Sequence, residues 1–220
     1  MSKNVLAGAR ASFAAAAGGF VDLVGAVNSE DWERPALGCW SVRSLVGHGA
    51  RALSTLVEYL GSGGPAISAD GVVLDDPVDY FWTVMAGNGG VADRERVDQA
   101  IAARGVLAGT ELGPDPAKSV ADKAVVALRV VESAPDDRVV LTPAGPMTLA
   151  GYLPTRTFEL AVHSLDLAEV CDLGVPGSLD LPIATSLELA GRLAGKKPEA
   201  ASLLHILTGR IVPVEPVSVL

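Results

Sequence analysis

The chain has 220 residues, of which 49% are hydrophobic and 20% are charged. It carries 17 Lys and Arg against 26 Asp and Glu, a formal charge of −9, so a basic nucleic-acid-binding protein is not expected. The apolar content argues against a disordered chain, and two cysteines are too few for a disulfide-dense scaffold or a Cys-rich zinc ribbon. The length fits one domain, with room for a small appendage.

Residues 1–27 are rich in alanine and resemble a signal peptide in composition. Arg10 and Asp22 interrupt the segment, and no apolar run reaches the roughly 20 residues that a bilayer requires. We therefore expect a helix that ends near Asn28, in a cytoplasmic protein without a membrane segment. The apolar residues at helical spacing are Val5, Phe13, Ala16, Ala17, Phe20, Val24 and Val27.

Helix signals continue along the chain. Ser41 suits the N-cap of a second helix that reaches about Leu60, and Asp76 with Pro77 suits the start of a short helix that ends near Met85. Further helices are expected over residues 92–112, 116–133, 148–172, 181–194 and 198–208. Loops are expected at 61–76, 87–90 and 174–177, an extended piece at 138–141 and a turn at 143–146. The chain is therefore predicted to be mainly α, with a helical bundle over 1–172 and a small C-terminal subdomain over 173–220.

The helix expected at 148–172 carries a polar stripe. Arg156, Glu159, His163 and Asp166 are spaced by three, four and three residues, so they lie on one face. Larger apolar residues border this face and the opposite face is small or polar, which favours charges that point into the protein or a cleft. Buried charges need partners or a metal, and Glu159 and His163 can converge on one ion.

A third metal ligand must come from another element, and His48 is the candidate. It lies at the edge of the apolar face of the second helix, where it either faces a groove between helices or is a partly exposed surface histidine. His205 lies in an apolar run and is interpreted as a core or interface residue. Cys39 and Cys171 are interpreted as buried packing residues. The residues expected to anchor the core are Trp32, Trp40 and Trp82.

Two blocks of sequence together form a specific pattern. The first contains Trp32 and Pro35 and continues through Gly38–His48, and the second joins Thr142–Thr148 to Thr155–Ala168. This pattern resembles the mycothiol-dependent maleylpyruvate isomerase family, within the DinB-like superfamily of metal-binding four-helix bundles. The resemblance covers about residues 1–172 and implies a DinB-like four-helix bundle with a small C-terminal extension.

In that family two histidines and a glutamate hold a divalent metal, usually zinc, which by motif position implies His48, Glu159 and His163. Such a set leaves one coordination position open. Asp166 suits a group that orients a ligand, the alternative being a surface charge. Arg156 and Arg210 are interpreted as cations that bind an anionic small-molecule substrate, the latter because it resembles a C-terminal arginine of the family. The alternative for both is an ordinary ion pair.

The resemblance also implies a reaction. A low-molecular-weight thiol (mycothiol) loses its proton at the metal and adds to a carbon–carbon double bond, and rotation and elimination then give the trans product. Ser44 stands where the family often has Asp, Pro154 lies inside a helix, and the tail after Gly174 is short. The function is interpreted as a thiol-dependent isomerase or S-transferase. The alternatives are a non-catalytic metal-binding or regulatory protein and a metal-dependent hydrolase that uses no thiol.

Overall fold

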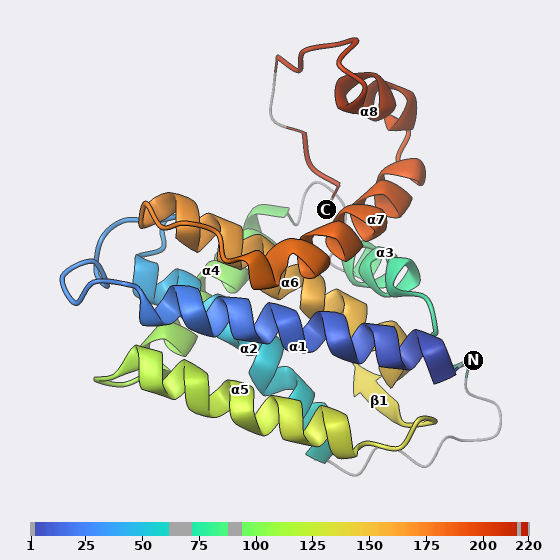
Figure 1. Ribbon diagram of the computed structural model, residues 1–220. Coiled ribbons are helices and arrows are strands. Elements are labelled where there is room, and N and C mark those ends of the chain that lie inside the picture. The colour runs from blue at the N-terminus through green and yellow to red at the C-terminus, as the bar shows by residue number, and fades with distance from the viewer. Residues whose placement is uncertain (1–2, 62–71, 88–93, 215–216, 220) are drawn as a thin grey trace.

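A computed structural model describes residues 3–61, 72–87, 94–214 and 217–219. Four long helices pack side by side (Figure 1): α1 (Lys3–Gly25), α2 (Val42–Gly61), α5 (Pro116–Ser133) and α6 (Leu149–Val170). A further helix, α4 (Arg94–Glu111), packs on α2, and α3 (Pro77–Gly87) packs on α6. The prediction of a mainly α, DinB-like helical bundle is confirmed. The expected loops at 61–76 and 87–90 and the expected helix start at 92 fall largely outside the described residues.

The helix starts follow local hydrogen bonding. Ser41 Oγ accepts from the backbone N–H of Ser44 at 3.4 Å, and Asp76 Oδ1 accepts from that of Val78 at 2.8 Å. Thr148 Oγ1 accepts from the N–H of Gly151 at 3.1 Å. Each bond satisfies an N–H that the first helical turn leaves without a partner, which explains why α2, α3 and α6 begin where the sequence predicts.

The first helix shows the expected apolar face with two differences. Phe13, Ala16, Ala17, Phe20 and Val24 are buried, together with Leu6 and Leu23. Val5, by contrast, is 53% exposed, because it lies near the free end of α1. The helix ends at Gly25 rather than near Asn28. The periodicity therefore predicted the buried face of the helix well, but it was less accurate near the two ends of the helix.

A two-stranded hairpin precedes α6, where a turn was expected at 143–146. Strands β1 (Val139–Thr142) and β2 (Gly145–Thr148) are antiparallel and pair Val140 with Met147. The expectation is wrong for the second half of the segment, which already belongs to β2. Leu74 stabilises this strand from a distant part of the chain, because its N–H donates to the carbonyl of Pro146 and its carbonyl accepts from Thr148.

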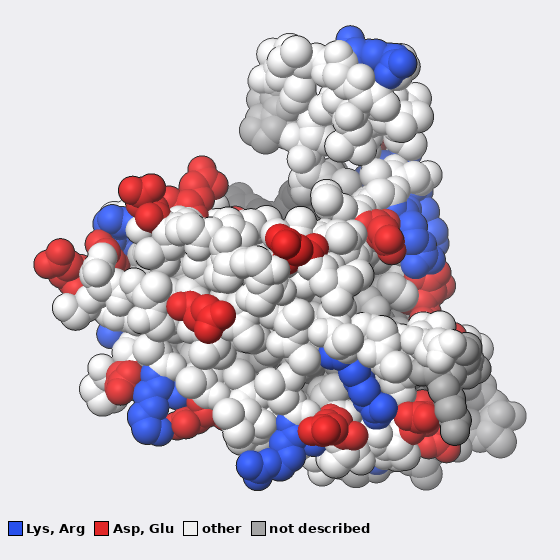
Figure 2. All heavy atoms as spheres, viewed as in Figure 1, with Lys and Arg blue, Asp and Glu red and all other residues white. Residues whose placement is uncertain are grey.

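The C-terminal residues begin by packing on the bundle and then leave it. A 3-10 helix, η2 (Gly177–Leu179), and helix α7 (Asp180–Gly195) contact α1 and α6 and bury Leu179, Leu189 and Leu193. Helix α8 (Ala200–Leu207) projects from the bundle (Figure 1), as a lobe that carries almost only uncharged side chains on the visible face (Figure 2). The division into two parts at residue 172 stays a prediction.

Two single-residue expectations are wrong, and a third is wrong in part. Trp82 is 39% exposed because it lies on the outer face of α3, although Trp32 and Trp40 are buried as expected. Cys39 is exposed in the loop before α2, whereas Cys171 is buried. His205 is exposed because α8 projects from the bundle, so it is not a core residue, and its place at an interface stays a prediction. Among the described residues, no helix combines the length and apolar character that a transmembrane span requires.

Candidate metal centre

The polar stripe on α6 faces polar side chains of α2, among them His48. The imidazole rings of His48 and His163 lie 4.8 Å apart, centroid to centroid, in an edge-to-face arrangement. Farther along both helices, the Tyr152 hydroxyl lies 3.5 Å from Thr55 Oγ1. Because residue numbers rise on one helix as they fall on the other, the two helices are antiparallel at this contact. His48, Glu159 and His163 each offer one ligand atom, and these atoms all lie within 4.8 Å of one another.

The ring of His163 is held from both nitrogens by carboxylates. Nδ1 lies 3.0 Å from Asp166 Oδ2, and Nε2 lies 3.5 Å from Glu159 Oε2. Burial alone would lower the pKa of His163, but the hydrogen bonds to Asp166 and Glu159 outweigh it and raise the pKa to about 9. In the metal-free protein His163 is therefore protonated at neutral pH.

The carboxylate of Glu159 is the anionic member of the cluster. Burial would raise its pKa, but the hydrogen bond to His163 and the charge of Arg156 together lower it to about 2. The Glu159 side chain is still 28% exposed and that of His163 is 12% exposed. The cluster thus lies at the edge of the bundle interior, in partial contact with solvent.

Within the described part of the chain, His48 is held by ring packing, and no hydrogen bond to its imidazole is found. The Trp40 ring lies 4.6 Å from the His48 ring, and the indole Nε1 donates to the carbonyl of Ala102 on α4 at 3.0 Å. Burial and the nearby His163 lower the pKa of His48 to about 4, so it is neutral at pH 7. Its Nδ1 atom is buried and has no hydrogen-bond partner among the described residues.

Arg156 lies beside the cluster but is covered by aromatic rings. Its guanidinium lies 4.9 Å from the centroid of the Tyr152 ring and 5.6 Å from that of Tyr80, and only 8% of the residue is exposed. It donates to Thr155 Oγ1 at 3.1 Å and to the Tyr80 hydroxyl at 3.4 Å. This placement brings its charge to Glu159 while the tyrosines separate it from solvent.

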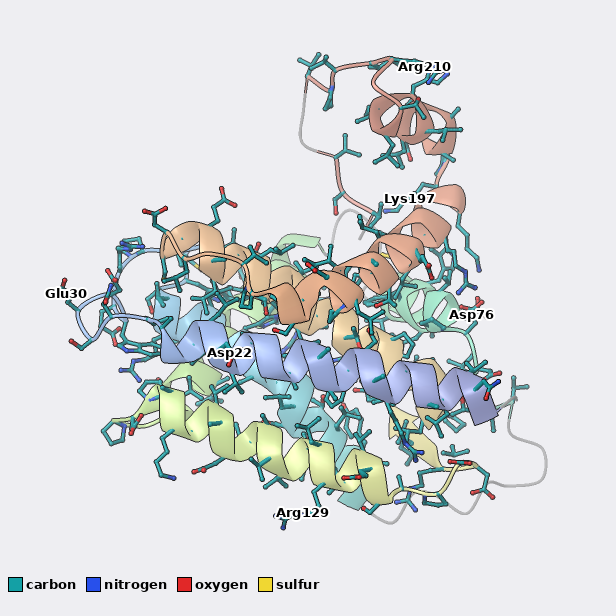
Figure 3. The ribbon with its side chains drawn as sticks, in the orientation of Figure 1. Asp22, Glu30, Asp76, Arg129, Lys197 and Arg210 are labelled. Carbon is teal, nitrogen blue, oxygen red and sulfur yellow. The ribbon has the colours of Figure 1, made fainter. Side chains whose placement is uncertain are left out.

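The structure brings together five of the six residues singled out from the sequence. Asp166 contacts His163 directly, and Arg156 acts on Glu159. Arg210 lies on the projecting C-terminal lobe, far from α2 and α6 (Figure 3), and donates locally to the carbonyl of Thr208. A cavity of about 290 Å³ between α1, α6 and α7 contains none of the six residues.

Several neighbours of the cluster were not identified from the sequence as site residues. Trp40 was expected only as a core residue. Tyr80 comes from α3, whose sequence contains no pattern that indicates a functional site. A signal did exist on α2, where His48, Arg51, Thr55 and Tyr59 are spaced by three, four and four residues. This second stripe faces the first one on α6.

The donor set fits a divalent metal. Two imidazole nitrogens and one carboxylate oxygen are the three protein ligands of an open zinc site. The buried and unpartnered His48 Nδ1 fits such a site, since a nitrogen left without a hydrogen-bond donor is costly unless something else occupies it. The contact between Asp166 and His163 Nδ1 leaves Nε2 as the atom that faces the other two ligands.

The fold and the cluster together define a class of protein, the DinB-like helical bundles with a His-Glu-His group between facing helices. Residues 13–168, well over half of the chain, match the model of the family described as mycothiol maleylpyruvate isomerase N-terminal domain. The chain therefore belongs to this family. Comparisons with curated proteins and with solved structures gave no match.

Proposed function

We propose that this protein binds one divalent metal, most simply zinc, through His48, Glu159 and His163. The observation that carries the proposal is the convergence of the three ligand atoms within 4.8 Å, from two helices that face each other. A bound ion supplies a positive charge that lowers the pKa of a thiol and polarises a substrate oxygen. The family membership supports the same site.

The surrounding residues prepare the ligands for this role. Asp166 accepts the Nδ1 proton of a neutral His163, which leaves the Nε2 lone pair directed at the cluster. Arg156 helps to keep Glu159 ionised, and Tyr80 and Tyr152 shield that arginine from water. We therefore assign Arg156 to positioning Glu159 rather than to binding substrate, and we leave Arg210 out of the site.

We further propose that the protein is a thiol-dependent isomerase or S-transferase that acts on a small molecule with mycothiol or a related thiol. One line of support is the family, whose description names a mycothiol maleylpyruvate isomerase. The other is the exposure of the cluster, where 28% of the Glu159 side chain is accessible. The open ligand position of a three-ligand site gives a thiol sulfur a place to bind.

The proposal is tested by turnover. Purified, zinc-loaded protein is incubated with a cis-configured unsaturated diacid, with and without a low-molecular-weight thiol, and the cis and trans products are separated chromatographically. The expected result is isomerisation or thiol adduct formation that needs both thiol and zinc. Isomerisation that does not need the thiol would contradict the thiol-dependent proposal, and metal binding with neither turnover nor thiol affinity would support a non-catalytic protein.

A further inference from the structure

A cavity of about 290 Å³ lies where helices α1, α3, α6 and α7 meet, and none of the proposed metal ligands lines it. Its size is at the lower end of the range for small-molecule pockets, which runs from about 300 to 1,000 Å³. Each long helix contributes residues three or four apart, so one face of each helix forms a wall. The lining residues are Val5, Gly8, Ala9 and Ser12 of α1, Pro77 of α3, Ala150, Pro154 and Thr157 of α6, and Thr185, Glu188, Leu189 and Arg192 of α7.

Gly8 and Pro154 give the cavity part of its room and one of its hydrogen-bond acceptors. Gly8 has no side chain, and an added Cβ would meet nothing within 4 Å. Pro154 lies inside α6 and has no backbone N–H, so it cannot pair with the carbonyl of Ala150 one turn earlier. Because Ala150 is buried and lines the cavity, its carbonyl is an acceptor that the helix itself does not satisfy at this position.

The three hydroxyl groups of the lining donate their protons within the protein. Thr157 donates to the carbonyl of Leu153 at 3.1 Å. Thr185 donates to the carbonyl of Leu181, also at 3.1 Å. Because a hydroxyl has only one proton, Ser12 is the donor in its 2.9 Å hydrogen bond with Thr185. These side chains can therefore offer a ligand lone pairs but no proton.

Glu188 carries the uncompensated charge of the lining. It is exposed, and it forms no ion pair with any of the described residues. Arg192, one turn later on α7, pairs with Asp76 at the start of α3. Lys196 pairs with Asp79 of α3 at 3.0 Å. The two cations at this end of α7 are thus neutralised by α3, and the cavity keeps the negative charge of Glu188.

We propose that this cavity is a second binding site, separate from the metal cluster, for a small organic ammonium ion. The apolar body of the ligand packs against side chains such as Ala9 and Leu189, and its charged nitrogen lies on the exposed side against Glu188. An ammonium group has three N–H donors and no acceptor, which complements a lining that offers lone pairs. An anion would face the carboxylate of Glu188, and the cation nearest to it, Arg192, already has a partner.

The test titrates the full-length protein at pH 7 with cyclohexylamine and benzylamine, which are both cationic at this pH, by isothermal titration calorimetry. Cyclohexanecarboxylate and benzoate, anions of similar shape, are titrated in parallel. We expect saturable binding of the amines with a Kd of about 1 mM, and binding of the two acids that is at least about tenfold weaker. The affinity for the amines should be the same in metal-free and zinc-loaded protein, because the cavity contains no metal ligand.

Two variants locate the binding site. Gly8→Leu places a side chain in the cavity and is expected to abolish amine binding, while leucine is a better helix former than glycine and keeps α1 intact. Glu188→Gln removes a charge-assisted hydrogen bond and is expected to weaken amine binding about tenfold. The matched controls are Gly18→Leu, where an added Cβ on the same helix also meets nothing within 4 Å, and Glu132→Gln, which is exposed on α5. Both controls lie outside the cavity and should bind the amines as the parent does.

Amine affinity that is unchanged in Gly8→Leu or in Glu188→Gln would place the ligand elsewhere and overturn the inference. The absence of saturable binding of both amines, or binding of the acids as tightly as the amines, would overturn it as well. If the amines bind only to the zinc-loaded protein, they bind the metal, and the inference fails while the proposed metal site stands. Melting curves of each variant check that it is folded.

Discussion

At the scale of single residues, His163 is the most tightly constrained member of the cluster. Carboxylates contact both of its ring nitrogens, so the metal-free protein holds a charged imidazolium with a pKa near 9. His48, 4.8 Å away, is held neutral by burial and by this neighbouring charge, with a pKa near 4. One proton thus occupies a position that a metal ion would take, which makes metal binding pH-dependent.

Zinc binding is expected to release close to one proton per ion at pH 7. The pKa of His163 is raised, so its proton is bound in the free protein, and it must leave before Nε2 can ligate a metal. The apparent affinity should therefore rise about tenfold per pH unit between pH 6.5 and 8. Calorimetry in PIPES and HEPES, which have different ionisation enthalpies, counts the protons. Binding with no proton release would contradict this assignment.

Asp166→Asn is expected to weaken zinc affinity by about 10- to 100-fold without unfolding the protein. Asn accepts the Nδ1 proton less strongly than a carboxylate does, so the ring orientation and basicity of His163 both suffer. Competition with a chromophoric chelator gives the affinity. Asp172→Asn is the matched control, because Asp172 is exposed just after α6 and its φ of 53° is one that Asn tolerates. If the two variants bind zinc equally well, Asp166 has no supporting role.

At the scale of elements, close helix contacts hold the two polar stripes in place. A Cβ on Gly47 would come within 2.2 Å of the backbone N of Gly109, so α2 and α4 touch at this point. A Cβ on Gly49 would meet Phe20 at 2.8 Å and His163 Cβ at 3.3 Å. The two glycines bracket His48, and their missing side chains let α2 approach its neighbours and bring His48 to the cluster.

Gly47→Ala is expected to reduce the free energy of unfolding by about 1–3 kcal/mol, since a backbone atom cannot move aside as a flexible side chain can. Urea denaturation gives the value. Gly191→Ala on α7 is the control: nothing lies within 4 Å of the added Cβ, so alanine should stabilise its helix by about 0.5–1 kcal/mol. A Gly47→Ala protein as stable as the parent would show that α2 and α4 are not in contact there.

Local sequence signals predicted the helix starts well, because each start depends on side chains within a single short segment. The helix starts at Ser41, Asp76 and Thr148 depend on side chains within three residues of the cap, so the sequence alone shows them. The second hairpin strand pairs with β1 and also with Leu74, more than 70 residues away, and this long-range pairing is not visible in the local sequence. Trp82 was misjudged because an aromatic residue does not reveal which face of α3 the bundle covers.

At the scale of the whole molecule, the bundle and the projecting lobe differ in how they are held. Side chains of the bundle form one continuous core that extends to Leu193 on α7. On α8 only Leu203 is buried, and Leu204 and Leu207 are 61% and 75% exposed. The lobe therefore contributes little to the stability of the bundle that carries the cluster.

Removal of residues 198–220 is expected to lower the free energy of unfolding by about 1 kcal/mol or less, a shift of about 2–4 °C in the melting temperature. Leu203 lies outside the main core and lines a cavity with Val217 of the tail, so both leave together, and Val219 is the one residue of the removed segment that packs, partly buried, against the core among those described. Zinc binding should be unchanged, because no ligand lies in the removed segment. A collapse of the melting temperature would show that the lobe supports the bundle.

Most of the candidate ligand set was predictable from the sequence because its spacing is helical. Glu159, His163 and Asp166 lie on one helix, so their proximity follows from the geometry of a turn. The pairing with His48 required the family resemblance, since periodicity cannot tell which helices face each other. Tyr152 lies four residues before Arg156 on α6, so its half of the cover follows from helical spacing, whereas Tyr80 comes from α3 and its contact is set by tertiary packing.

The most direct test of the central claim is the zinc content of four purified proteins, the parent and the variants His48→Ala, His163→Ala and His205→Ala, measured by mass spectrometry after dialysis against trace zinc. His205 is the third histidine of the chain and is exposed on α8, which makes it the matched control. A site built by His48, Glu159 and His163 predicts about one zinc per chain in the parent and in His205→Ala. It predicts little or none in the other two variants. Equal zinc in all four proteins, or none in the parent, would contradict the account.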